Sequence, residues 1–179
     1  ALGVAARVPV RPTEALVSVT SVETHNPAAP NESVAMISFE FDAWVGRPLA
    51  DTGLYGYLPE LAALVREGTV FLVFYNPRCS HCHELFEAHF AGALTLPVIA
   101  IEIPPPPGGT LVETDEPTEI QCPECQRLSL PTTNAWGVTP PAVVRIEDGI
   151  VRCAGEANAL TPTDCIGAIT TTLPAGAPR

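Results

Sequence analysis

The chain has 179 residues and a formal net charge of −11, and all nine of its basic residues are arginines. Such an acidic surface repels phosphate backbones and anionic lipids, which argues against nucleic-acid binding and against membrane docking through a basic patch. Hydrophobic residues make up 46% of the chain and charged residues only 16%, so the chain can fill a core and is not a disordered acidic tail.

The N-terminal region, residues 1–33, contains four prolines and one short β-branched run from Ala15 to Val22. This pattern predicts an extended arm with one strand, followed by a domain over residues 34–176 and a tail over residues 177–179. The chain begins without methionine, and we expect a mature or trimmed form whose signal or membrane anchor is not included.

The first half of the domain alternates between strand and helix patterns. An unbroken apolar run from Val70 to Tyr75 is typical of a central strand that is buried on both faces. The other expected elements are a half-buried strand over 36–41, a turn over 44–49, a helix over 57–66, a helix from 79 to about 91 and a second buried strand over 96–103.

The second half begins with a run of four prolines, Pro104 to Pro107, which fits neither a helix nor a central strand. We therefore expect residues 104–120 to be an inserted loop. Strands over 142–146 and 150–153 form a predicted hairpin around Glu147-Asp148-Gly149, and a last helix is expected from Thr161 to about Leu173.

Six cysteines are the strongest chemical signal in the sequence, at positions 79, 82, 122, 125, 153 and 165. An even number with two Cys-x-x-Cys pairs fits three disulfides, or one redox pair and two structural pairs, in an oxidising compartment. We therefore expect an extracytoplasmic protein, periplasmic or secreted.

Three local patterns, in this order, resemble the thioredoxin superfamily over residues 34–175. The first is the core strand that leads through Asn76-Pro77-Arg78 into Cys79-Ser80-His81-Cys82. The second is Trp136-Gly137-Val138-Thr139-Pro140-Pro141, which is similar to the family's cis-proline loop, and the third is the hairpin followed by a terminal helix. The resemblance implies an α/β fold, a thioredoxin-like three-layer sandwich with a central mixed sheet after an extended N-terminal arm. It also implies thiol–disulfide oxidoreductase activity without a cofactor.

The sequence departs from the family pattern at several positions. Val73 stands where the family usually has a buried acid, and Arg78 stands where many members have Trp or Phe. The loop is one residue shorter than usual, so the cis proline is Pro141 or Pro140, with the downstream spacing favouring Pro141.

The start of a helix is a reactive place for a dithiol, because unpaired backbone N–H groups and the helix dipole stabilise a thiolate there. Cys79 is therefore predicted to attack a partner's disulfide and Cys82 to resolve the mixed disulfide. Ser80, His81 and Arg78 are predicted to tune the pair. A histidine before the second cysteine resembles the strongly oxidising bacterial DsbA type, which implies a more oxidising potential than that of thioredoxin. The loop with Thr139, Pro140 and Pro141 is predicted to expose backbone groups to an extended partner chain.

The remaining cysteines leave several interpretations open. Cys122 and Cys125 fit a structural disulfide, a second redox pair that relays electrons at the sheet edge carrying Cys79, or half of a metal site. Cys153 and Cys165 are candidates for a disulfide between the hairpin and the last helix.

Two other functions compete with the enzyme. Cys79, Cys82, Cys122 and Cys125 are soft ligands that suit zinc or copper, although the interval between the pairs is longer than in common zinc ribbons. A redox-silent thioredoxin-like binding module is the other alternative. For the enzyme, the expected partners are cysteine-containing proteins and a redox partner that recharges the site.

Overall fold

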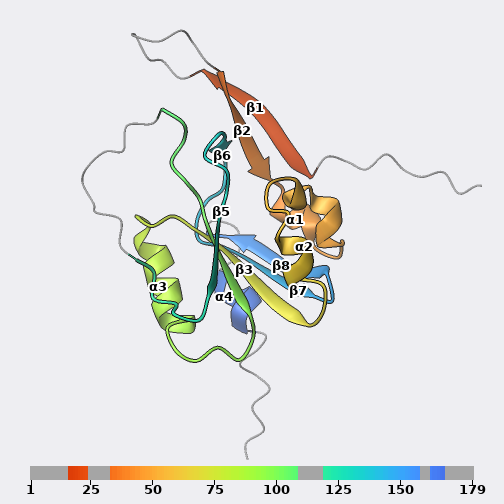
Figure 1. The fold of residues 1–179 in the computed structure, drawn as a ribbon, viewed down its shortest axis with the longest axis vertical. Coiled ribbons are helices and arrows are strands. Elements are labelled where there is room, and N and C mark those ends of the chain that lie inside the picture. The colour runs from red at the N-terminus through yellow and green to blue at the C-terminus, as the bar shows by residue number, and fades with distance from the viewer. Residues whose placement is uncertain (1–15, 24–32, 109–118, 158–161, 168–179) are drawn as a thin grey trace, which may run out of the picture.

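The computed structural model describes residues 16–23, 33–108, 119–157 and 162–167. Its strands are β1 Val17–Glu23, β2 Ser33–Phe39, β3 Thr69–Tyr75, β4 Val98–Glu102, β5 Gln126–Ser129, β6 Ala135–Trp136, β7 Ala142–Glu147 and β8 Ile150–Glu156. Its helices are α1 Phe41–Trp44, α2 Leu61–Leu64, α3 Ser80–His89 and α4 Pro162–Gly167, with 3₁₀ turns η1 Leu49–Thr52 and η2 Leu54–Gly56. The fold is therefore mixed α/β, as the sequence predicts (Figure 1).

The larger of two mixed sheets has the strand order β5-β4-β3-β7-β8, with β3 at its centre. β3 runs parallel to β4 and antiparallel to β7. The side chains of β3 from Val70 to Tyr75 are all buried, which confirms the central strand that the apolar run predicts.

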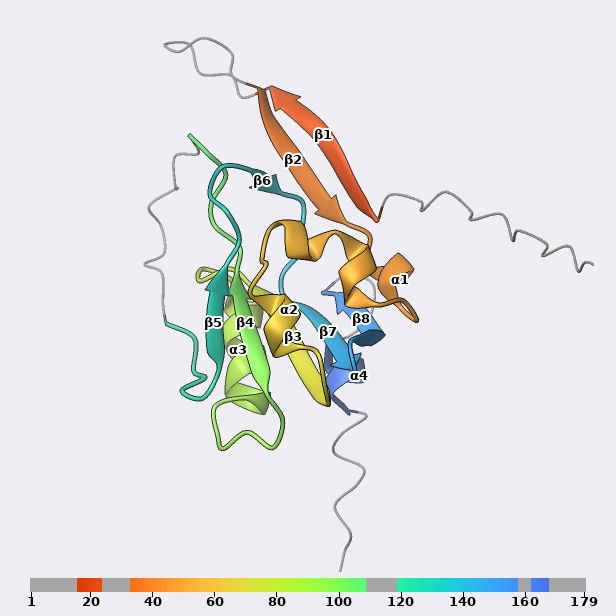
Figure 2. The same cartoon turned by 45° about the vertical axis from the view of Figure 1, so that its right-hand side comes forward.

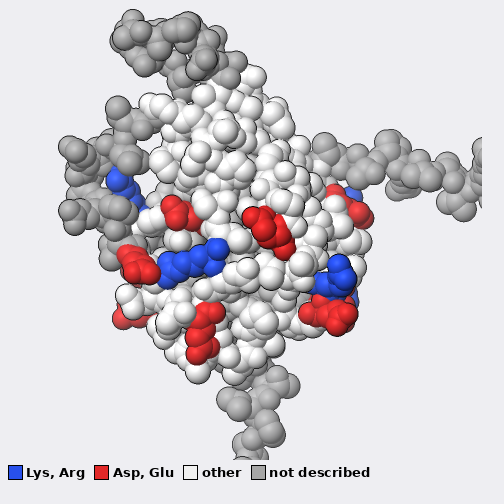
Figure 3. Space-filling view, in the orientation of Figure 1, with Lys and Arg blue, Asp and Glu red and all other residues white. Residues whose placement is uncertain are grey.

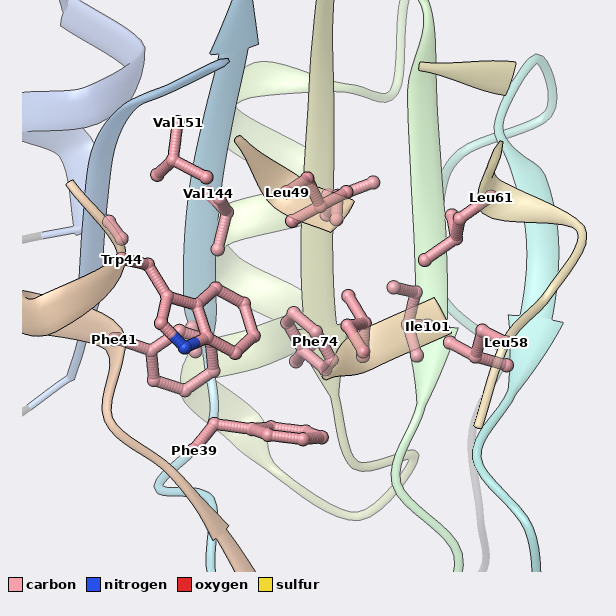
Figure 4. Packing of buried hydrophobic residues seen from close by; sticks show 14 of the residues in the cluster. Phe39, Phe41, Trp44, Leu49, Leu58, Leu61, Phe74, Ile101, Val144 and Val151 are labelled. Carbon is pink, nitrogen blue, oxygen red and sulfur yellow. The ribbon is translucent and has the colours of Figure 1, made fainter. Parts of the chain in front are cut away.

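Each face of this sheet is covered by helical segments (Figure 2). Side chains alternate between the faces of a strand, so Leu72 and Phe74 pack with Trp44 and other residues of the segment from α1 to α2 (Figure 4). On the opposite face, Val73 packs with Phe86 of α3 and with α4. β3 is therefore packed between two apolar clusters, one on each face of the sheet. This packing positions the end of the strand, from which the chain continues to Cys79.

The smaller sheet has the order β1-β2-β6, in which β1 is antiparallel and β6 parallel to β2. Leu16, just before β1, is 5% exposed, and its carbonyl accepts a hydrogen bond of 3.3 Å from Nε1 of Trp44. The predicted strand near Ala15 to Val22 is therefore present, and it is anchored to the domain by pairing and by this bond. Residues 1–15 and 24–32 of the predicted arm lie outside the described residues.

The hairpin between β7 and β8 follows the prediction. Asp148 and Gly149 both have positive φ, 50° and 76°, as both central residues of a two-residue type I′ turn require. Oδ1 of Asp148 also accepts the N–H of Gly68 at 2.9 Å, which ties this turn to the start of β3.

Other predicted elements differ in extent. Instead of a helix over 57–66, α2 spans only Leu61–Leu64, and the preceding chain forms 3₁₀ turns. Within the predicted insert, residues 104–108 form neither helix nor strand, and residues 109–118 lie outside the described part. The last helix is α4, and the rest of its predicted span, Thr161 and residues 168–173, also lies outside.

In the ranges that the structure describes, no helix has the length and apolar character needed to cross a membrane.

Candidate active site

A tight turn after β3 delivers Cys79 to the beginning of α3. The side-chain oxygen of Asn76 accepts the N–H of Arg78 at 2.9 Å, and its backbone oxygen accepts the N–H of Cys79 at 3.0 Å. Asn favours such turns because its side chain bonds to the backbone two residues on. The turn thus places Cys79 at the N-cap position of α3.

The sulfur of Cys79 acts as the cap of this helix. It accepts a hydrogen bond of 3.2 Å from the backbone N–H of Cys82, which also donates to the carbonyl oxygen of Cys79 at 3.0 Å. Cys79 is partly exposed. The sulfur thus lies at the start of α3 in a position that a partner molecule can reach.

Cys82 lies one helical turn further on and is fully buried. Burial raises the pKa of its thiol well above the usual range, and the hydrogen bond with Cys79 and the charge of Cys79 raise it further, against a smaller opposing effect of the Asn76 backbone. Val73 belongs to the same apolar cluster as Cys82. The two free cysteines therefore differ: the first is partly exposed and accepts a backbone N–H, and the second is buried and keeps its proton.

The loop before β7 lies beside Cys79. The thiol of Cys79 donates to the carbonyl oxygen of Pro140 at 3.7 Å, across 61 residues of sequence. The peptide bond between Pro140 and Pro141 is cis, which makes Pro141 the cis proline. The N–H of Thr139 donates to Oε1 of Glu156 at 2.8 Å.

The predicted tuning residues lie around the first turn of α3. Ser80 and His81 are exposed and Arg78 is partly buried. His83, which the sequence offers as a further soft ligand for the metal alternative, instead places Nε2 at 2.7 Å from the carbonyl oxygen of Pro77. Because a carbonyl oxygen only accepts, Nε2 carries the hydrogen, and this bond joins α3 to the turn before it.

Cys122 and Cys125 form a disulfide with a Cα–Cα distance of 5.4 Å. The expected position beside Cys79 is wrong. Gln126 pairs with Ile99 at the beginning of β4, because the chain returns along the sheet before entering β5 in the parallel direction. The disulfide therefore lies on the order of 15 Å away from Cys79, and a direct relay between the two pairs has no support.

Cys153 of β8 and Cys165 of α4 form the second disulfide, with a Cα–Cα distance of 5.5 Å. This pairing confirms the predicted link between hairpin and last helix. Two disulfides are compatible with an extracytoplasmic location.

The metal alternative loses half of its ligands to the Cys122–Cys125 disulfide. Among the residues that the structure places, no three His, Cys, Asp or Glu side chains are grouped so that they can hold a metal ion. On the face in Figure 3, arginines lie singly near acidic side chains and form no continuous basic patch.

Sequence reasoning did not single out Glu156. A glutamate at the end of a strand carries no local signal, since its contact with Thr139 joins distant segments. Neither the models of known protein families nor the curated protein sequences contain a match to this chain, so a functional assignment rests on the geometry of the Cys79–Cys82 site.

Proposed function

We propose that the protein is a thiol–disulfide oxidoreductase that exchanges disulfides with partner proteins through Cys79 and Cys82. One observation carries the proposal: the only free cysteines among the described residues lie together at a helix start, with the Cys79 sulfur partly exposed and capped by a backbone N–H. A purely structural pair would have no need of an accessible sulfur in a position that favours the thiolate.

The reaction proceeds in two exchange steps. The Cys79 thiolate attacks one sulfur of a partner disulfide, a mixed disulfide forms, and the other partner sulfur leaves as a thiolate. Cys82 then gives up its proton and attacks the Cys79 sulfur, which releases the second partner sulfur. The partner gains two electrons and the Cys79–Cys82 pair becomes a disulfide. In the reverse direction, the oxidised pair introduces a disulfide into a partner dithiol.

The different environments of the two sulfurs support these roles. Burial and the neighbouring Cys79 keep Cys82 protonated, so Cys82 reacts poorly with disulfides in solution. It attacks only after Cys79 has formed a mixed disulfide with a partner. Cys79 is the sulfur that an incoming disulfide meets.

We also propose a thioredoxin-like three-layer sandwich. The support is the central parallel β3–β4 pair, the dithiol at the end of β3, the proline loop before the antiparallel β7, and helical segments on both faces. The two disulfides support an extracytoplasmic site of action, periplasmic or secreted. The partners are proteins with reactive cysteines and a redox protein that recharges the site.

Trapping of mixed disulfides tests this proposal. Cys82→Ala leaves Cys79 without its resolving thiol, so we expect it to accumulate covalent complexes that disappear on reduction with dithiothreitol. Electrophoresis without reductant and mass spectrometry of the linked peptides give the measurement.

Cys79→Ala is the matched control, because it keeps one cysteine of the pair and removes the exposed sulfur. We expect it to trap almost nothing. Equal trapping by both variants would show that the roles are misassigned, and no trapping by either would refute the enzyme.

A further inference from the structure

The loop that faces the Cys79 sulfur has almost no free hydrogen-bond donors on its backbone. Pro140 and Pro141 have no N–H, and the N–H of Thr139 is bound to Glu156 at 2.8 Å. The carbonyl oxygen of Pro140 lies 3.7 Å from the Cys79 sulfur. Beside the reactive atom, the backbone of Thr139, Pro140 and Pro141 therefore offers acceptors only.

Glu156 reaches this loop from the last residue of β8, where its backbone pairs with Ala142 of β7. Its side chain borders a cavity of about 100 Å³ with Glu40 and Asp42, between β2, α1 and β8. Burial raises the pKa of Glu156, and the charges of Asp42 and Glu40 raise it further, while the Thr139 N–H opposes them. The carboxylate is held in this unfavourable position with its hydrogen bond aimed at the loop.

We propose that Glu156 is a positioning residue for disulfide exchange, which occupies the Thr139 N–H and fixes the Thr139–Pro141 loop so that it presents carbonyl acceptors to the N–H groups of an extended partner chain. The inference rests on the proposed function and extends it to partner recognition. Glu156 acts through Thr139 and touches no reacting atom. Its effect should therefore be confined to partners that have a polypeptide backbone.

Two substitutions at position 156 separate hydrogen bonding from charge. Glu156→Ala removes the acceptor, whereas Glu156→Gln keeps an oxygen that can accept the Thr139 N–H. Asp42→Asn is the control, because it removes a neighbouring charge on an exposed residue without touching the loop.

The assay compares two oxidants of the reduced Cys79–Cys82 pair: insulin, which has protein disulfides, and 2-hydroxyethyl disulfide, which has no peptide backbone. For Glu156→Ala we expect kcat/KM with insulin to fall about tenfold, as for the loss of one charge-assisted hydrogen bond, and the rate with 2-hydroxyethyl disulfide to stay within about twofold. Glu156→Gln should lose clearly less than Glu156→Ala, because its amide oxygen can still accept the Thr139 N–H, and Asp42→Asn should behave like the parent protein at neutral pH. An equal loss with both oxidants, or no loss with insulin, overturns the proposal.

The amide resonance of Thr139 gives an independent test that needs no activity. We expect its proton shift to follow the titration of Glu156 and to move upfield in Glu156→Ala, with the titration displaced to lower pH in Asp42→Asn. If the parent protein reacts with neither disulfide, the proposed function fails, and this resonance still decides whether Glu156 holds the loop. A Thr139 amide that ignores both pH and substitution overturns the positioning role.

Discussion

At the scale of single residues, the two sulfurs of the Cys79–Cys82 pair differ in exposure, because Cys82 lies one helical turn further into α3 and faces the core. Cys79 caps α3 and is partly exposed, while Cys82 packs among apolar side chains of β3 and α3. A buried group that resists ionisation affects stability as well as reactivity, since the folded and unfolded chains then bind protons differently.

The raised pKa of Cys82 predicts a loss of stability in alkaline solution. The unfolded thiol ionises near its ordinary pKa of about 8.5, whereas the folded thiol keeps its proton. This contribution is present below about pH 8.5 and is lost as the pH rises further. In a Cys79→Ala background, which needs no reductant, we expect urea unfolding to show a fall of about 1 kcal/mol between pH 7.5 and pH 9.5.

The control for this measurement is the double variant Cys79→Ala/Cys82→Ala. It lacks the Cys82 thiol and has every other titrating group of the single variant. Its free energy of unfolding should lack the additional fall. Parallel pH profiles for the two chains would mean that Cys82 ionises as easily in the folded protein as in the unfolded one.

At the scale of elements, the contact between β2 and the segment after β6 places the loop with Pro140. The N–H of Gly137 donates to the carbonyl oxygen of Ile37 at 2.8 Å, and a Cβ at Gly137 would collide with Oγ of Ser38. A glycine here, two residues before Thr139, leaves room for the side chain of Ser38.

Gly137→Ala should therefore destabilise the protein by about 1–3 kcal/mol, as is typical of overpacking. Adding Ser38→Ala removes the colliding oxygen and should restore most of the loss, as measured by thermal or urea unfolding. Gly56→Ala is a control, because no atom lies within 4 Å of the new Cβ there. If Ser38→Ala fails to rescue Gly137→Ala, the close approach is not the reason for the glycine.

The sequence predicts best those structural features that depend on residues close together along the chain. The β3 strand, the helix start at Cys79 and the Asp148-Gly149 turn follow from local patterns, and the structure has all three. The edge strand β5 was not predicted, because its residues are largely exposed and it forms by pairing with β4. For the same reason the bond from Thr139 to Glu156 has no signature in the sequence: it joins segments that only the β7–β8 pairing brings together.

At the scale of the whole molecule, two disulfides that close loops of different length stabilise the fold. The Cys153–Cys165 bond links positions 12 apart and joins β8 to α4, whereas the Cys122–Cys125 bond links positions only 3 apart. A disulfide that closes a longer loop restricts the unfolded chain more.

Replacing Cys153 and Cys165 with alanine should therefore lower the free energy of unfolding by about 2–4 kcal/mol. The same change at Cys122 and Cys125 should cost about 1 kcal/mol less, since the loop it closes is about fourfold shorter. Urea denaturation of both double variants checks the order, and the reverse order would contradict it. Trapping by Cys79 should survive in both variants.

The distance between the Cys122–Cys125 disulfide and the Cys79–Cys82 pair has a kinetic consequence. For the proposed oxidoreductase, each cycle would leave the Cys79–Cys82 pair in the opposite redox state, and an external protein would have to restore it at the same partly exposed sulfur. Substrate and regenerating protein would then bind in turn at one small surface. Steady-state rates measured while both concentrations vary should give parallel double-reciprocal lines, with each protein inhibiting when it is in large excess.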